Sequence, residues 1–404
     1  MTQAAPNIHA PGKEFIVLMA SLMAMAAISI DAILPALGVI SHDLQIANRN
    51  HAQYLIGGIF AGMAAGQLLA GPLSDAFGRK KILYVGFCIY LIGSIVGYTA
   101  GTMQVLLIGR VIQGLGVAGP YISAISIVRD RYAGRQMAKL MSIVMMIFMV
   151  VPAVAPSIGQ AVMSLSSWRG IFVLYFIYAV TICVWIVFRL EETLPRERRI
   201  PFHARNIIEG FRQVVATRTS MFYMMCSGIC FGSLIGYLNS SQQIFQDQFG
   251  TGEMFSIYFG ALAVVVAASS MMNSRIVEKL GMRYIAFRAF LCIISSSAAF
   301  LLLHGFVEIE LWMFLIYAAA MFFSFGLIFG NLNALAMEPL GHIAGIASAV
   351  IGSVSSLISM TIGAVIGQLY NGTLIPMTSG FLMLGILAVV MMTLAERARA
   401  KASA

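Results

Sequence analysis

The sequence predicts an all-α integral membrane protein of twelve transmembrane helices in two six-helix bundles. Three observations carry this prediction. Of the 404 residues 60% are hydrophobic and only 10% are charged, whereas soluble domains are roughly half apolar and one-quarter charged. At about 20 apolar residues per crossing, this length accommodates about a dozen spans. A long basic segment near the middle of the chain then separates six apolar runs from six.

Charged and turn residues mark the individual spans, because helices buried in lipid and in a bundle are apolar on all sides. In the first half, the polar stretches 41–52, 75–81, 101–103, 129–136 and 163–167 separate spans at 15–40, 53–74, 82–100, 104–128, 137–162 and 168–189. In the second half, 246–252, 276–283, 305–309, 336–342 and 371–373 separate 219–245, 253–275, 284–304, 310–335, 343–370 and 374–395. The first run is too long for a cleaved signal peptide, so we expect it to remain a span.

This division predicts a tail at 1–14, a six-helix bundle at 15–189, a linker at 190–218, a second bundle at 219–395 and a tail at 396–404. All but three of the 25 Lys and Arg residues fall on the side of the two tails; the exceptions are Arg49, Arg110 and Arg169. The positive-inside rule therefore predicts that both termini are cytoplasmic. We expect the arginine-rich linker to be an amphipathic segment that contacts headgroups, rather than a regulatory site.

A weak internal repeat links the two halves. Shifting the sequence by about half its length places Asp75 on Glu278 and Gly78 on Gly281, in the loop after the second span of each half. The same shift places Leu73 on Ile276 and Lys80 on Arg283. Transporters are often built from such repeats.

Several classes of function are disfavoured. The net charge of +9 lies in loops rather than on a basic face, so we expect no nucleic-acid partner. The five cysteines lie in apolar stretches without metal-ligand spacing, and no phosphate-binding GxxxxGK[ST] loop is present, so no metal or other cofactor is expected. An enzyme would need a nucleophile–base pair at membrane depth, and His304 and His342 fall near opposite faces. A sensor would need a signalling domain, for which no room remains.

The loop between spans two and three, 71–81, reads GPLSDAFGRKK. Pro72 and Gly78 allow a sharp turn, Asp75 can bond backbone donors at a helix start, and Arg79 can pair with a carboxylate. The stretch resembles the signature loop of the major facilitator superfamily, GxLaDrxGrkxxl, including Gly71. The resemblance implies the major facilitator fold and a cytoplasmic latch formed by Asp75, Arg79 and Asp130.

Three further stretches resemble members of that superfamily. Residues 106–118 in span four resemble its RxxqGxga helix. Residues 151–160 in span five partly match the antiporter motif GPxxGG, with Pro156 and Gly159 in place but Ala155 and Gln160 where glycines are usual. Residues 29–37 resemble the DxxLPAL stretch of drug/proton antiporters, particularly the bicyclomycin and chloramphenicol resistance (Bcr/CflA) branch. The resemblance implies that Pro152, Pro156 and Gly159 seal the cavity against proton leak; the alternative is that they permit close helix packing.

Asp31 and Arg110 are the two charges expected inside the membrane. At a rise of about 1.5 Å per residue they lie at similar depths, and each alone would cost about 2.5 to 3.5 kcal/mol at the bilayer centre. Both should therefore face the bundle interior, where they could pair. Burial and a nearby guanidinium act on a carboxyl in opposite directions, which favours a group that binds and releases a proton as access changes. The alternatives are a static bridge between the two, a role in capping polar groups between helices, or an Arg110 that Gln113 and Gln67 hold without a part in coupling.

Polar and aromatic residues at membrane depth are candidates for substrate binding. They are Tyr54, Gln67, Tyr121, Tyr237, Asn239, Gln242, Asn331 and Asn333. Each alone is more often a packing residue than a binding residue. The 27 Met and 26 Phe offer an adaptable surface suited to loosely specified apolar ligands.

By resemblance we expect a monomeric exporter of small amphipathic or drug-like compounds in exchange for protons, in a bacterial inner membrane. Asp31 would accept the proton, and Arg110 would adjust the pKa of Asp31. The alternatives are an exporter of one natural metabolite such as a siderophore, or an importer that works by proton symport. The expected partners are a small solute, protons and lipid.

Overall fold

The computed structural model describes residues 12–403 except 133 and 200, and across them the secondary structure is helical without a strand. The first-half helices are α1 (Lys13–Asp31), α2 (Leu37–Asp43), α3 (Tyr54–Phe77), α4 (Arg79–Thr99), α5 (Met103–Arg131), α6 (Gly134–Leu165) and α7 (Arg169–Arg189). The others are α8 (Ala204–Ala216), α9 (Arg218–Gln242), α10 (Phe255–Leu280), α11 (Met282–His304), α12 (Leu311–Met337), α13 (Ala344–Gln368) and α14 (Ile375–Ser403). Short helical turns named η1 to η6 join some of them.

The predicted all-α membrane fold is confirmed. Among the described residues, 11 helical segments are long and apolar enough to cross a membrane. The remaining predicted span is α6, a helix of 32 residues, whose stretch Val150–Leu165 is apolar. The predicted tail 1–14 lies outside the described residues except for its last three positions. The predicted tail 396–404 continues α14 as a helix up to Ser403.

The first predicted span, 15–40, is interrupted. It consists of α1, the short turn η1 (Leu34–Ala36) and α2. Pro35 explains the interruption, because it has no N–H to donate to the carbonyl of Asp31 and its ring disfavours a continuous helix. The sequence analysis treated this span as one helix. The break places Asp31 at the end of α1.

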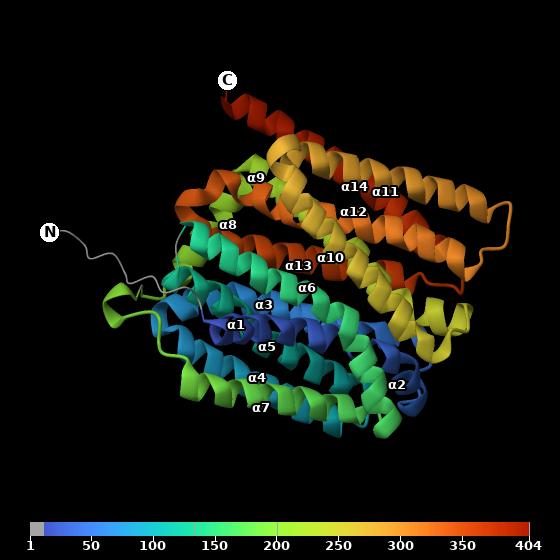
Figure 1. Ribbon diagram of the computed structural model, residues 1–404, viewed down its shortest axis with the longest axis horizontal. Coiled ribbons are helices and arrows are strands. Elements are labelled where there is room, and N and C mark those ends of the chain that lie inside the picture. Colours follow the sequence, from blue (N-terminus) through green and yellow to red (C-terminus); the bar gives the residue numbers. More distant parts are fainter. Residues whose placement is uncertain (1–11, 133, 200, 404) are drawn as a thin grey trace.

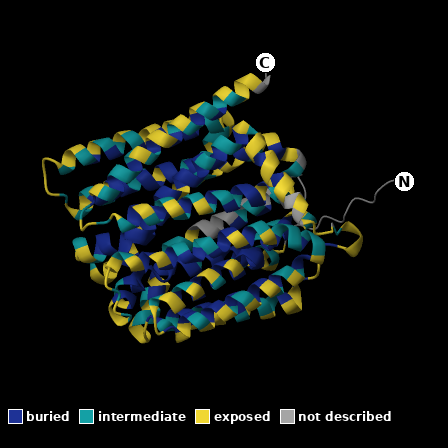
Figure 2. Cartoon of the chain, turned by 180° about the vertical axis from the view of Figure 1, so that it is seen from behind, coloured by how far each residue is buried: buried dark blue, intermediate teal, exposed yellow. Residues whose placement is uncertain are grey.

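The helices of each half lie together. In Figure 1, α1 to α7 form the lower group and α9 to α14 the upper group. Within the first group α5 contacts α1, α3 and α4, and within the second group α9 contacts α12, α13 and α14. The most extensive helix contacts between the groups are those of α3 with α13 and of α6 with α10. Buried residues gather between the helices, whereas exposed ones cover the outer surfaces (Figure 2).

Helix α1 begins and α14 ends at the same face of the bundle, which we call the terminal face. Glu14 in the first turn of α1 accepts a hydrogen bond of 2.6 Å from Arg189 at the end of α7. The other side, where α2, the turn η2 (Arg49–Gln53) and the turn η4 (Gln243–Gln248) lie, is called the opposite face.

Small residues bring the helices of the first half into backbone contact. A Cβ atom on Gly62 of α3 would lie 2.0 Å from the carbonyl oxygen of Val111 in α5. One on Gly114 of α5 would lie 2.1 Å from the carbonyl oxygen of Ile59 in α3. Neither position tolerates a side chain unless the helices separate. Glycines therefore set the spacing of the helix pair that carries Arg110.

We expect Gly62→Ala to destabilise the protein by about 1–3 kcal/mol, because the added methyl group would displace a backbone carbonyl. The thermal unfolding midpoint in detergent measures this. Gly57→Ala in the same helix is the control, since its Cβ would meet Met360 at 3.7 Å, an ordinary contact. Equal midpoints for both variants would contradict the close α3–α5 contact.

Candidate functional site

The junction between α3 and α4 is a tight corner at the terminal face. Helix α3 ends at Phe77. Gly78 follows with a φ of +103°, which favours glycine, and α4 begins with the next residue, Arg79. Arg79 is only 2% exposed. Its guanidinium donates to Asp75 at 2.6 Å and to Asp130 at the end of α5 at 2.8 Å. The residues that sequence analysis grouped as a latch therefore meet, and the contact lies within the first half.

Two details of this corner differ from the expectation. Pro72 lies inside α3 rather than in the turn, because the helix continues to Phe77. Asp75 bonds Arg79 rather than the free backbone donors at the start of α4. Those donors are met by Glu192 of the linker, which accepts from the N–H groups of Arg79 at 3.0 Å and Lys80 at 3.2 Å. Sequence analysis missed Glu192 because it lies more than 100 residues away along the chain.

The second half has a corresponding corner. Gly281, with a φ of +81°, joins α10 to α11. Arg283 donates to Glu396 of α14 at 2.9 Å and also contacts Glu338 at the end of α12. The sequence shift aligned Lys80 with Arg283, but the cation that pairs in the first half is Arg79. Both halves thus have a glycine corner held by an arginine. In the alignment of the two halves, Arg79 and Arg283 are offset by one position.

Arg110 is fully buried and lies beside the break in the first span. The last helical bond of α1 runs from the Ala32 N–H to the Ile28 carbonyl, which leaves the Ser29 carbonyl available. Arg110 donates to that carbonyl at 2.7 Å and to the Leu55 carbonyl at 3.2 Å. Tyr175 of α7 also donates to the Ser29 oxygen, at 3.2 Å. A cation therefore lies at the C-terminal end of α1, the negative end of its dipole.

A chain of buried hydrogen bonds extends from Arg110 into the first bundle. Arg110 donates to the Gln113 side chain at 2.9 Å, and Gln113 donates to the Ser94 hydroxyl at 2.9 Å. Ser94 donates to the Tyr90 carbonyl, and the Tyr90 hydroxyl lies 2.5 Å from the Ser29 hydroxyl. These contacts fix the guanidinium without any carboxylate.

Asp31 does not pair with Arg110. Among the described residues the Asp31 carboxyl forms neither an ion pair nor a hydrogen bond, although the residue is only 5% exposed. It lies close enough to the hydroxyls of Tyr175 and Tyr237 to interact with them electrostatically. Tyr237 belongs to α9, so the carboxyl of the first half lies within electrostatic range of a side chain of the second. The pairing that the sequence made plausible, including the alternative of a static bridge between Asp31 and Arg110, is therefore not formed among the described residues.

Helix α6 packs directly against the break. A Cβ atom on Gly159 would lie 1.8 Å from the carbonyl oxygen of Ala32, the residue after Asp31. One turn and a half earlier, the Ala153 carbonyl lies against Gly260 of α10, where a Cβ would be 2.6 Å away. Pro152 and Pro156 both lie inside α6. The glycine of the antiporter-like motif therefore allows contact between α6 and the interrupted span.

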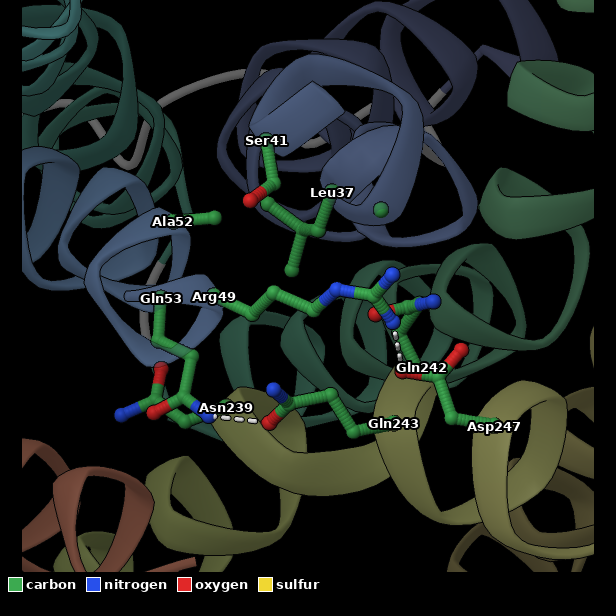
Figure 3. A pocket seen from close by; sticks show the side chains of 10 residues that line it. Leu37, Ser41, Arg49, Ala52, Gln53, Asn239, Gln242, Gln243 and Asp247 are labelled. Atoms are coloured by element: carbon green, nitrogen blue, oxygen red, sulfur yellow. Dashed lines mark hydrogen bonds and ion pairs between the residues drawn. The ribbon is translucent and has the colours of Figure 1, made fainter. Parts of the chain in front are cut away.

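Three of the substrate-binding candidates lie at the opposite face. Tyr54 stacks on His51 with ring centroids 5.4 Å apart. Asn239 and Gln242 line a cavity of about 10 Å³ together with Gln53 and Gln243, which is room for about one water molecule. Figure 3 shows these side chains meeting from the two halves. Side chains of the two halves therefore close the space between the halves at the opposite face.

The closure at the opposite face is a network of amide hydrogen bonds between the halves. Gln53 donates to Gln243 at 2.6 Å, and Gln243 donates to Asn50 at 2.9 Å. Asn50 donates to the carbonyls of Gln368 and Tyr370, at 3.2 and 2.9 Å. Arg49 and Asp247 add an exposed ion pair at 3.6 Å. Sequence analysis did not identify Asn50, Gln243 or Gln368.

The other substrate-binding candidates do not gather at this cavity. Gln67 is buried in α3, with its amide oxygen beside Gly352 of α13. Tyr121 lies partly buried in α5. Asn331 of α12 donates to Asn273 of α10 at 2.9 Å, and Asn333 is exposed. Tyr237 is buried between Phe322 and Phe259, with ring centroids 4.8 and 5.9 Å away.

Comparison with known proteins settles the family. Residues 17–364 match the Major Facilitator Superfamily. The chain belongs to this superfamily. It is 27% identical to the bicyclomycin resistance protein homolog of Haemophilus influenzae, over 90% of this chain and 91% of that protein. It is 21% identical to multidrug resistance protein D of Escherichia coli, over 84% of each chain. The crystal structure of a D-xylose–proton symporter, 14% identical, superposes with a TM-score of 0.71 over 94% of this chain and 97% of that one.

The superfamily assignment confirms the resemblance that the loop 71–81 indicated, and it makes this chain a multi-pass membrane transporter rather than an enzyme.

Helix α9 stands out from the other helices by its buried polar atoms. Five of its buried side-chain oxygens have no hydrogen-bond partner among the described residues. They are the hydroxyl oxygens of Ser220, Ser227, Tyr237 and Ser240 and the amide oxygen of Asn239. A polar group buried without a partner is costly. Buried water molecules commonly supply partners for such groups.

We expect Glu192→Ala to lower stability by about 1 kcal/mol, because α4 loses the acceptor for its first backbone donors. The thermal unfolding midpoint of the purified transporter measures the effect. Glu191→Ala is the matched control, because Glu191 accepts no hydrogen bond among the described residues and its loss removes the same charge. Equal midpoints would show that Glu192 does not hold the start of α4.

Proposed function

We propose that this transporter exports small amphipathic or drug-like compounds in exchange for protons. It would act as a monomer in a bacterial inner membrane, with the terminal face in the cytoplasm. The names of relatives that cover most of the chain, a bicyclomycin resistance protein homolog and a multidrug resistance protein, support the substrate class. The concentration of Lys and Arg in the loops of the terminal face supports the orientation.

The Asp31 carboxyl is the observation that carries the proposal. It is buried at a helix break, lies within electrostatic range of Tyr237 in the second half, and has no ion-pair or hydrogen-bond partner among the described residues. A carboxylate held in a static ion pair would need to break that pair before it could accept a proton. Asp31 does not, because the Ser29 and Leu55 carbonyls bind the nearby guanidinium instead. Asp31 is therefore poised to exchange a proton.

In the proposed cycle, the two halves alternate between opening at the terminal face and opening at the opposite face. A solute that enters from the cytoplasm favours the ionised form of Asp31 and displaces its proton. Opening of the opposite face then releases the solute and exposes the carboxyl to protons from outside. Arg110 holds the end of α1 throughout by its bonds to the Ser29 and Leu55 carbonyls. The α6 contact with Ala32 would keep protons from leaking past the break.

We expect Asp31→Asn to abolish drug resistance, because an amide cannot bind and release the coupling proton. The measurement is growth of a pump-deficient bacterial host against a chemically diverse panel of toxic compounds. Wild type and variant are compared at equal membrane levels, and Glu253→Gln, which removes an exposed carboxylate, is the control. Resistance that persists in Asp31→Asn would exclude this residue as the coupling site.

A wild-type protein that protects against no compound would exclude broad drug export and favour a single natural solute, such as a siderophore. Direction is tested in inverted vesicles with an imposed proton gradient. Solute accumulation on acidification of the vesicle interior supports antiport. Solute efflux that accompanies protons in the same direction supports the symport alternative, which the fold also permits because a symporter shares it.

We expect the double variant Asn50→Ala/Gln243→Ala to open the opposite face more often, because it removes hydrogen bonds that join the halves. Each net bond contributes about 0.5–1.5 kcal/mol, so the open population should rise about ten-fold or more. The measurement is labelling of Ser41→Cys, which lines the cavity, by a membrane-impermeant thiol reagent. Asn371→Ala is the control, because Asn371 bonds only within its own loop, to Thr373. An unchanged labelling rate would contradict the closure.

A further inference from the structure

Helix α8 in the linker has two apolar faces, only one of which the protein covers. Gly210 lies against Ile346 of α13, where a Cβ would meet the Ile346 side chain at 2.1 Å, and Val214 is fully buried. Ile208, Phe211 and Val215 follow one another at helical spacing and are 67, 47 and 37% exposed. At 100° per residue this second stripe lies about a third of a turn from the face that packs on α13.

The polar side chains of α8 complete the arrangement. Arg205 and Arg212 lie next to the exposed apolar stripe, on the side away from α13. Glu209 and Gln213, both exposed, lie farther round, opposite the apolar stripe. Going round the helix, the order is therefore the bundle, an apolar stripe, two arginines and a neutral or acidic face. An interfacial helix has this order when it lies along the edge of a membrane protein.

The charge of the segment points to the sign of its partner. Arg205 shares its charge with Glu209, at 2.7 Å, whereas Arg212 has no carboxylate partner among the described residues. Arg198 before α8 and Arg218 after it are exposed as well. The segment is thus basic where it borders the apolar stripe. An arginine that borders an apolar stripe on a membrane surface can bind the phosphate of an anionic lipid headgroup.

We propose that α8 lies in the headgroup region of the membrane leaflet at the terminal face. The stripe Ile208–Phe211–Val215 inserts among the upper acyl chains, and Arg205 and Arg212 bind the phosphates of anionic phospholipids. Such a helix buries its apolar face about 5–10 Å into the headgroup boundary. Because α8 packs on α13 and α13 packs on α3 of the other half, this lipid contact connects the membrane surface to the seam between the halves.

Fluorescence quenching in lipid vesicles tests the placement. Cys88, Cys183 and Cys292 are replaced by serine, and the buried Cys226 and Cys230 are kept; the parent background must remain unlabelled. A small fluorophore is then attached to Ile208→Cys or, as the matched position on the same helix, to Gln213→Cys. We expect lipid-borne doxyl groups to quench the label at 208 and aqueous iodide to quench the label at 213. Equal iodide quenching at both positions would overturn the proposal.

The choice of headgroup is tested with the same label at 208. Doxyl phosphatidylglycerol and doxyl phosphatidylcholine are compared as quenchers in otherwise identical vesicles. We expect phosphatidylglycerol to be enriched near the label, and Arg205→Gln/Arg212→Gln to reduce that enrichment by up to about five-fold for each arginine. Arg196→Gln/Arg198→Gln, which removes the same charge outside α8, should leave the enrichment nearly unchanged. Equal enrichment in the wild type and in both double variants would exclude the two arginines of α8 as the anionic-lipid site.

Discussion

Inside a bilayer each backbone N–H and carbonyl needs a partner within the protein, because the hydrocarbon offers none. This constraint determines how the centre of the transporter is built. Pro35 interrupts the first span, and the interruption leaves the Ser29 carbonyl without its helical partner. Arg110 and Tyr175 supply the missing donors. A charged residue in the membrane thereby satisfies a backbone group, and Asp31 is left beside it without a bonded partner among the described residues.

The same constraint explains the glycines around the break. Arg110 reaches Ser29 only if α5 lies close to α1 and α3, and Gly62 and Gly114 allow the backbones of α3 and α5 to approach within direct contact. Gly159 does the same for α6 against Ala32. In a membrane, small residues at helix contacts permit close packing where no hydrophobic drive between helices exists. The position of Asp31 therefore follows from several glycines on three different helices.

Much of this fold could be predicted from the sequence, because apolar runs and basic loops mark membrane spans directly. The corner at Gly78 and Arg79 was also predictable, since its residues lie close together in the chain and in a motif. Gln113 could be named from the sequence as a partner of Arg110, but the Ser29 and Leu55 carbonyls could not, because charge complementarity suggested Asp31 and no local pattern marks a free backbone carbonyl. Glu192 and the amides at the opposite face were missed for a related reason. Their partners lie 100 or more residues away, and no local pattern marks an uncharged amide as a contact between halves.

The two faces use different chemistry, and the difference fits what each contact has to do. Arg79 and Arg283 hold corners within one half each, through buried or half-buried ion pairs. Breaking such a pair would leave a charge poorly solvated, so these corners suit parts that move as a unit. Asn50, Gln53 and Gln243 instead join one half to the other through neutral amides. Water can replace amide hydrogen bonds at a net cost of about 1 kcal/mol each. The contact that the proposed cycle opens is therefore made of bonds that hydration largely replaces.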